Sequence, residues 1–329
     1  MAHDTTTLAA PAAGKAHLHA QADTSYQRIA FWLMAAAFVL LPLAVYPVFL
    51  MKVMCFALFA CAFNLLIGFG GLLSFGHAMF LGTAGYATAH AAKEWGVTPE
   101  LAIVFGTACS ALLGWVTGLL AIRRQGIYFA MITLALAQMV FFFYLQTPFT
   151  HGEDGIQGVP RGKLFGVVDL NDRVAMYALV FVVFFGGFLL IWRIVHSPFG
   201  QVLKAIRENE PRATSLGYDT DRYKLVAYIL SGTLSGLAGA MKALVFQLAS
   251  LTDVYWTMSG EVVLMTLVGG LGTLFGPVVG AAVIITMQNY LAQIGAWVTI
   301  VQGAIFVLCV LAFRRGIVGE IAHLLRKPL

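Results

Sequence analysis

The chain has little charge and little cysteine, and each shortage excludes a class of protein. Charged residues make up 11% of its 329 residues and hydrophobic residues 60%, whereas soluble domains carry about 25% charged residues. A soluble domain of ordinary size is therefore excluded, and one membrane-embedded domain is expected. The four cysteines stand inside hydrophobic runs without metal-ligand spacing, so we expect buried thiols rather than ligands or disulfides at Cys55, Cys61, Cys109 and Cys309.

The motifs of the common enzyme classes are also missing. The sequence contains no Gly-x-Ser-x-Gly, no His-Glu-x-x-His, and no His or Cys cluster with ligand spacing. It lacks the phosphate-binding motif Gly-x-x-x-x-Gly-Lys-Ser/Thr as well, so no ATPase site is expected. No cofactor and no metal are expected, and a membrane-embedded enzyme is the least favoured class. Energy for active transport would have to come from separate subunits.

Long hydrophobic runs predict an all-α polytopic membrane protein with about ten transmembrane or re-entrant helices. A helix needs about 20 mainly apolar residues to cross the hydrocarbon core, and helices satisfy their own backbone polar groups there. The glycine-rich third and eighth runs are expected to be either full crossings or broken, re-entrant helices. The ten expected spans are 29–50, 53–70, 72–92, 101–122, 126–147, 174–195, 223–247, 258–275, 277–293 and 297–313.

Basic residues set the expected orientation, because Lys and Arg are retained on the cytoplasmic side during insertion. Of the 20 basic residues, fourteen fall in segments expected inside and five outside, while Lys242 lies in a span and is expected to snorkel. Both termini are therefore expected in the cytoplasm, and the dispersed charge does not indicate nucleic acid. We expect a disordered cytoplasmic tail over 1–27, a transmembrane domain over 28–318 and a cytoplasmic tail over 319–329.

The expected cytoplasmic loop 197–224 is too long for a simple connection between two spans. Pro211 favours two short helices, or one helix with proline in its first turn, and Gly217 stands where a helix is expected to end. The pattern favours either a surface that docks a soluble partner or a helix that lies on the lipid interface. The hydrophobic residues that recur at helical spacing are Val202, Leu203, Ile206, Ala213 and Leu216.

Two segments resemble one transporter family. The run 204–218 (KAIRENEPRATSLGY), followed by Tyr223-Lys-Leu, resembles the coupling loop of the larger permease subunit of branched-chain amino acid ABC importers, and the run 64–86 (NLLIGFGGLLSFGHAMFLGTAGY) is similar to the same family. The resemblance extends over about residues 50 to 318. It implies a type II importer fold in the bacterial inner membrane. Two such permeases would pair around a central path, with two cytoplasmic ATPases and an external solute-binding protein.

The resemblance also implies that the loop sits in a groove on the ATPase. The broader Glu-Ala-Ala motif of importer permeases, followed three residues later by Gly, is only partly present, because Pro211-Arg212-Ala213 stands before Gly217. The acidic residue is absent in register, and Glu208 or Glu210 is expected to substitute for it. The candidate coupling residues are Arg207, Glu208, Glu210, Arg212, Ala213, Leu216 and Gly217.

Polar side chains within the spans are candidates for the translocation path, because a charged group costs about 2.5 to 3.5 kcal/mol on insertion scales and should face protein or water. Each has a second interpretation. His77 is either an interhelical hydrogen-bonding residue or a solute contact, and Glu261 either lies at a dipole-stabilised helix N-terminus or on the path. The candidate path residues are Asn64, Ser74, His77, Thr133, Gln138 and Glu261.

Glycines mark two segments that resemble each other. The glycines of 68–85 favour either close helix packing or a broken helix that presents backbone dipoles to a solute. The later segment 269–276 is similar to 70–76 with one residue inserted, which suits either an inverted repeat that meets near the path or a chance match. The expected external loop 148–173, with its glycines and acidic pair, is either an ordinary solvated loop or a docking surface for a binding protein.

The solute and the energy source are left open by the residues alone. The resemblance implies branched-chain or other hydrophobic amino acids, with urea, short amides and aromatic acids as alternatives because related permeases carry them. An ion-coupled secondary transporter is the alternative class. It would need buried ionisable groups along its path, and only His77, Lys242 and Glu261 qualify.

Overall fold

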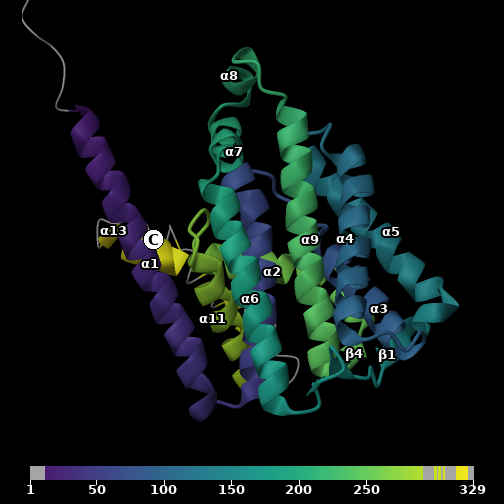
Figure 1. Ribbon diagram of the computed structural model, residues 1–329. Coiled ribbons are helices and arrows are strands. Elements are labelled where there is room, and N and C mark those ends of the chain that lie inside the picture. The colour runs from purple at the N-terminus through teal and green to yellow at the C-terminus, as the bar shows by residue number, and fades with distance from the viewer. Residues whose placement is uncertain (1–11, 292–299, 302, 305–306, 308–315, 325–329) are drawn as a thin grey trace, which may run out of the picture.

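The computed structural model describes residues 12–291, 300–301, 303–304, 307 and 316–324. Most of them form a bundle of long helices, with α7 and α8 at its upper end and the short strands β1 and β4 at its lower end (Figure 1). The helices are α1 (Ala12–Leu40), α2 (Pro47–Asn64), α3 (His77–Lys93), α4 (Pro99–Ala121), α5 (Ile127–Gln146), α6 (Arg173–His196), α7 (Pro198–Glu208), α8 (Glu210–Ser215), α9 (Thr220–Phe246), α10 (Trp256–Gly269), α11 (Gly276–Leu291) and α13 (Gly316–Leu324).

Short elements close the lower end of the bundle. Strand β1 (Ile156–Gln157) pairs antiparallel with β4 (Leu248–Ala249), which joins the 148–173 loop to the end of α9. A second hairpin within the same loop pairs β2 (Lys163–Leu164) with β3 (Val168–Asp169). A single 3₁₀ turn, η5 (Leu251–Asp253), leads from β4 towards α10.

Six helices among the described residues are long and apolar enough to cross a membrane. They agree with the first, second, fourth, fifth, sixth and seventh expected spans, and they confirm an all-α, multi-pass membrane protein. The six segments are Tyr26–Leu43, Pro47–Phe69, Pro99–Ala121, Ile127–Gln146, Arg173–His196 and Thr220–Phe246.

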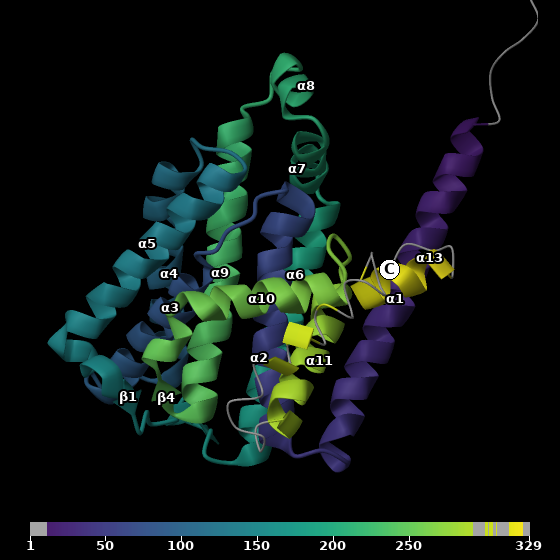
Figure 2. The ribbon, with the colours of Figure 1, turned by 180° about the vertical axis from the view of Figure 1, so that it is seen from behind.

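The glycine-rich spans differ from full crossings. Helix α3 begins only at His77, because residues 71–76 are not helical, and α10 has 14 residues. The ninth expected span is the 16-residue helix α11, and the tenth lies largely outside the described residues. Figure 2 shows α10 lying across the neighbouring helices instead of along them. Two breaks between helices result: the first break is residues 71–76, between the π-helical turn η2 (Leu65–Phe69) and α3, and the second break is residues 270–275, between α10 and α11.

The two expected tails also contain helix. Helix α1 begins at Ala12, well before the expected first span, while residues 1–11 lie outside the described part of the chain. Helix α13 runs from Gly316 to Leu324 and packs against α10 and α11, where a tail was expected from residue 319.

Helix α2 is the centre of the bundle. It is hydrophobic on every side, and 89% of its spanning window is buried by the protein itself, which is the pattern of a helix without a lipid-facing side. Helices α6, α9, α10 and α11 pack around it. Residues of α2 therefore contact most of the helices around the two breaks.

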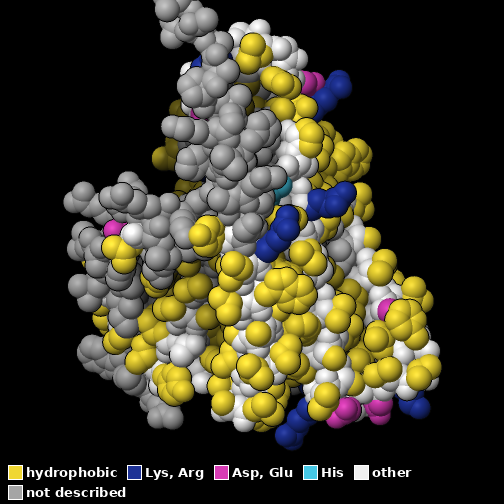
Figure 3. Space-filling model, turned by 60° about the vertical axis from the view of Figure 1, so that its left-hand side comes forward, with side chains coloured by type: hydrophobic (Ala, Val, Ile, Leu, Met, Phe, Trp, Pro, Cys, Tyr) yellow, Lys and Arg dark blue, Asp and Glu magenta, His cyan; other side chains and the backbone are white. Residues whose placement is uncertain are grey.

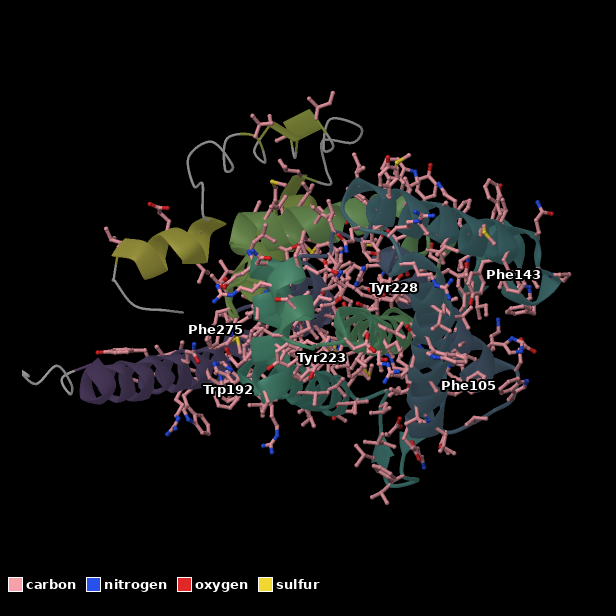
Figure 4. The ribbon with its side chains drawn as sticks, turned by 90° about the horizontal axis from the view of Figure 1, so that it is seen from above. Phe105, Phe143, Trp192, Tyr223, Tyr228 and Phe275 are labelled. Carbon is pink, nitrogen blue, oxygen red and sulfur yellow. The ribbon has the colours of Figure 1, made fainter. Side chains whose placement is uncertain are left out.

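The outer surface suits a lipid environment. Figure 3 shows a face on which hydrophobic side chains predominate, with charged side chains gathered mainly at its lower edge and in its upper part. Seen from above, Tyr228 lies within the bundle while Phe105 and Phe143 lie towards its rim (Figure 4). Their exposures agree, at 0%, 40% and 56% respectively. Large exposed apolar side chains of this kind are stable in lipid and not in water.

Helices α3 and α9 approach most closely at Gly239. A Cβ atom at this position would lie 2.0 Å from the backbone oxygen of Leu81, so no side chain fits between the two helices. Small residues of this kind allow membrane helices to pack backbone against backbone.

We predict that Gly239→Val destabilises the folded protein by about 3 kcal/mol or more, because overpacking against backbone cannot be relieved by a rotamer change. The matched control is Gly186→Val, since Gly186 is exposed on α6 and nothing lies within 4 Å of its added Cβ. Thermal unfolding in detergent, followed by fluorescence-detected size exclusion, measures both. Equal midpoints for the two variants would contradict the α3–α9 packing.

Candidate coupling and translocation site

The expected loop 197–224 forms two short helices, as its prolines and its glycine predict. Ser197 caps α7 by accepting a hydrogen bond from the Gly200 amide at 3.3 Å, and Asn209 caps α8 by accepting one from the Arg212 amide at 3.0 Å. Helix α8 ends at Ser215, and Gly217, two residues later, has a φ of +89°, a left-handed conformation that favours glycine. Two short helices form, as Pro211 predicts: the chain breaks at Asn209, and Pro211 lies in the first turn of α8.

The apolar side of α7 packs on the protein itself. Leu203 is fully buried and lies beside Gly70. Gly70 follows the π-helical turn η2 (Leu65–Phe69), which continues α2 up to the first break. Lys204 places its ammonium over the ring of Phe69, 5.5 Å from the centroid. Burial lowers the pKa of Lys204 below its ordinary value. The helix is therefore attached to the bundle and does not lie flat on a lipid surface.

Glu210 ties α8 to the neighbouring elements. Its Oε1 accepts hydrogen bonds from Gln125 at 2.9 Å and Thr220 at 3.3 Å, and it forms an ion pair with Lys224. The side chains of Lys224 and Glu210 are 3% and 23% exposed, so this pair is largely removed from solvent. Loss of one partner of such a pair is strongly destabilising. Of the two acids expected to substitute in the coupling motif, Glu210 therefore holds the loop's own structure.

The remaining candidate coupling residues divide by exposure. Ala213 is buried beneath α8, whereas Arg212 and Gly217 are exposed and Leu216 is 70% exposed. Glu208 faces a cavity of about 390 Å³ that is also lined by Phe69, Lys204, Arg207 and Gly272. The tip of α8 thus presents an uncovered apolar side chain at the upper end of the molecule (Figure 1).

Arg207 of α7 lies beside both breaks. Its guanidinium donates a hydrogen bond to the backbone oxygen of Gly68, in η2 just before the first break. A methyl group on Gly272, in the second break, would meet the same guanidinium at 3.4 Å, and one on Gly71 would meet the arginine stem at 2.9 Å. A single side chain from the loop therefore bonds to the residue Gly68 before the first break and lies close to the second.

Asn64 joins the two breaks to each other. Its amide nitrogen donates to the Thr273 oxygen at 2.8 Å, and its amide oxygen accepts from the Gly272 amide at 3.0 Å. A Cβ atom on Gly68 would lie 2.2 Å from that amide oxygen, so glycine is required there for the contact. The segment 269–276 therefore packs against Asn64 and Gly68, just before the segment 70–76 that it resembles in sequence.

Three other candidate path residues are packed inside protein. His77 Nε2 lies 2.8 Å from Ser231 Oγ, which donates to the Ala62 oxygen at 2.6 Å, and Phe63 and Phe80 flank the ring edge to face. Thr133 accepts from the Phe75 amide at 3.2 Å, and Ser74 accepts from the Gly76 amide at 3.2 Å. His77, Ser74 and Thr133 are all fully buried, so they anchor the irregular segment 71–76.

The last two candidates lie elsewhere. Gln138 on α5 is partly buried, and its side-chain oxygen is buried without a hydrogen-bond partner among the described residues. Glu261 on α10 lines a cavity near the lower end of the bundle. The structure therefore does not bring the six candidate path residues together into one site.

Lys242 does not snorkel as expected. Its ammonium forms an ion pair with Asp253 of η5, and the two side chains are 16% and 11% exposed. The pair lines the same cavity as Glu261. The sequence alone did not predict this ion pair, because Asp253 lies 11 residues after Lys242 and beyond β4. The two side chains meet only because the chain turns back after α9.

Comparison with known proteins agrees with this architecture. A family described as "Branched-chain amino acid transport system / permease component" matches residues 47–310. The high-affinity branched-chain amino acid transport system permease protein LivM of Salmonella typhimurium (strain LT2) is 24% identical over 80% of this chain and 68% of its own length.

Sugar permeases are also similar. The ribose import permease protein RbsC of Bacillus subtilis (strain 168) is 29% identical over 67% of this chain and 70% of its own. The fructose import permease protein FrcC of Rhizobium meliloti is 23% identical over 66% of this chain and 63% of its own. No solved structure matches this chain. The family match covers most of the sequence, and the chain therefore belongs to the permease-component family of branched-chain amino acid transport systems.

Proposed function

We propose that the chain is one permease subunit of an ABC importer in the bacterial inner membrane and forms half of a translocation path for branched-chain or hydrophobic amino acids. Two cytoplasmic ATPases, a second homologous permease and an external solute-binding protein complete the assembly. The observation that carries the proposal is the loop 197–224. It presents the tip of α8 outward while Arg207, on α7, lies beside both breaks.

The proposed mechanism uses this connection. Nucleotide-driven closure of the ATPases moves α8 through Arg212, Leu216 and Gly217, and Glu210 transmits the motion to α9 through its pair with Lys224. Arg207 transmits it to η2 and to the segment after α10. Interrupted helices in transporters commonly lie beside the path, so motion of the loop would change access to it.

The solute assignment leans on the branched-chain relatives. The ribose and fructose permeases among the similar proteins make a sugar the second candidate, and urea, short amides and aromatic acids remain further alternatives. An ion-coupled secondary transporter is disfavoured, because His77 is enclosed by packed aromatic rings and Lys242 is already paired with Asp253.

Assembly and energy source are tested together by purification. The tagged chain, expressed with the genes encoded beside it, should co-purify with an ATPase and a second permease. In proteoliposomes that hold the binding protein, leucine uptake should require ATP. Uptake by this chain alone, driven by an ion gradient, would contradict the proposal.

We predict that Arg207→Ala lowers ATP-dependent uptake at least tenfold while the complex still assembles. The reason is that the variant removes the side chain that bonds to Gly68 and lies close to the second break. Arg123→Ala is the matched control, since Arg123 is exposed in the α4–α5 connection at the same end. Uptake per assembled complex is the measurement. Equal rates for the two variants would show that Arg207 has no role in coupling.

We predict that Gly217→Leu abolishes solute-stimulated ATP hydrolysis without affecting membrane insertion. A side chain at a φ of +89° strains the backbone by about 1 to 3 kcal/mol and displaces the end of α8. The control is Gly96→Leu, because Gly96 has a φ of +63° and open space around it in the α3–α4 connection at the opposite end. Persistent stimulation in Gly217→Leu would refute the assignment of the loop.

A further inference from the structure

A charged cavity lies at the end of the bundle opposite to α8. Its volume is about 580 Å³, within the range of about 300 to 1,000 Å³ that small-molecule sites occupy. Helices α2, α9, α10 and α11 and the turn η5 all contribute to its wall. Its polar and charged lining includes Lys52, Lys242, Asp253, Glu261 and Gln288.

The cavity is lined by two positive and two negative side chains, of which only Lys242 and Asp253 form an ion pair within the described residues. Lys52, five residues into α2 from Pro47, is half-buried and has no hydrogen bond and no ion pair there. An anionic group bound in the cavity would give its ammonium a direct partner.

A negative side chain lines the same cavity. Glu261 on α10 is half-buried and shares the cavity wall with Lys52, Lys242 and Gln288. It forms none of the ion pairs found in the described part of the chain. The cavity therefore offers a cation on α2 and an anion on α10 that are not joined in an ion pair.

The rest of the lining is apolar. Phe56 stands one turn above Lys52 on α2, Lys242 lies over its ring at 5.4 Å, and Phe246, Leu248 and Met258 complete that part of the wall. A ligand that satisfies the whole cavity would carry a carboxylate, an ammonium and a small hydrophobic group. This combination describes a zwitterionic amino acid with an aliphatic side chain.

We propose that this cavity is a binding site for a free α-amino acid at the outer side of the permease. Lys52 and Lys242 hold the carboxylate, Glu261 holds the ammonium, and Phe56 and Met258 contact the aliphatic side chain. The proposal rests on the proposed function for its orientation and deepens it by naming the residues that would hold the solute. A neutral sugar would leave the opposed charges of Lys52 and Glu261 without partners.

Direct binding tests the site separately from transport. The assembled permease and ATPase complex, placed in lipid nanodiscs without the binding protein, is mixed in turn with leucine, leucinamide, 4-methylpentanoate and ribose, and saturation-transfer difference NMR is recorded. Leucine should give a saturable signal. Leucinamide lacks the carboxylate and 4-methylpentanoate lacks the ammonium, so each should give a tenth of that signal or less, as should ribose.

Variants locate the binding. Lys52→Gln and Glu261→Gln should each lower the leucine signal at least tenfold, while Lys52→Arg keeps the charge and should retain most of it. Lys163→Gln is the matched control, since Lys163 is exposed in the β2–β3 hairpin at the same end. If a variant fails to assemble, the ligand series on the unaltered complex still decides.

Several outcomes would overturn the site: no leucine signal, a ribose signal equal to that of leucine, equal signals from leucine, leucinamide and 4-methylpentanoate, or an unchanged signal in Lys52→Gln. ATP-dependent leucine uptake by the complete transporter is measured in parallel and tests only the proposed function. If ATP-dependent uptake persists but leucine does not bind at this cavity, the binding site is refuted and the importer function stands. If leucine binds but no ATP-dependent uptake is found, the importer function is refuted and the binding site stands.

Discussion

A helix that stops inside a membrane must find hydrogen-bond partners for its last carbonyls and its first amides within the protein, because lipid supplies none. The described residues contain two breaks between helices, and polar side chains bind their backbone groups. Asn64 bonds to the backbone of Gly272 and Thr273 in the second break, and Arg207 donates to the Gly68 carbonyl just before the first. The position of α2, the tilt of α10 and the attachment of α7 all follow from that shared set of bonds.

The same arrangement separates two ends of different character. The upper end is held by an arginine and by the Glu210 and Lys224 pair, with an exposed helix tip beyond them. The lower end holds the cavity with its opposed charges. Because α2 leads to the first break and α10 ends at the second, a shift of the breaks alters the spacing of Lys52 and Glu261, which sit on those helices. Coupling and solute contact would then be consequences of one movement.

Local signals in the sequence predict what local physics determines. Hydrophobic length predicts the six long helices, and Pro211 with Gly217 predicts the two-helix loop. Glycine content marks the breaks, although not that α3 would begin as late as His77.

Local sequence signals do not predict contacts between segments that are far apart in the chain. The partner of Asn64 lies 209 residues away, and Lys52, Lys242 and Glu261 converge only after four helices have packed. His77 shows the converse, since an intramembrane histidine is expected at a functional position and here supports packing through Ser231.

The most direct test is a pair of distance measurements by electron spin resonance on the assembled transporter, in a background without its four cysteines. One pair of labels is placed at Leu216 and Leu271, and a reference pair at Leu216 and Phe165, all of them exposed. If Arg207 and Asn64 bind the loop and the breaks into one unit, ATP binding should change the reference distance and leave the Leu216 to Leu271 distance constant. A change in the Leu216 to Leu271 distance as large as that of the reference pair would contradict the shared movement.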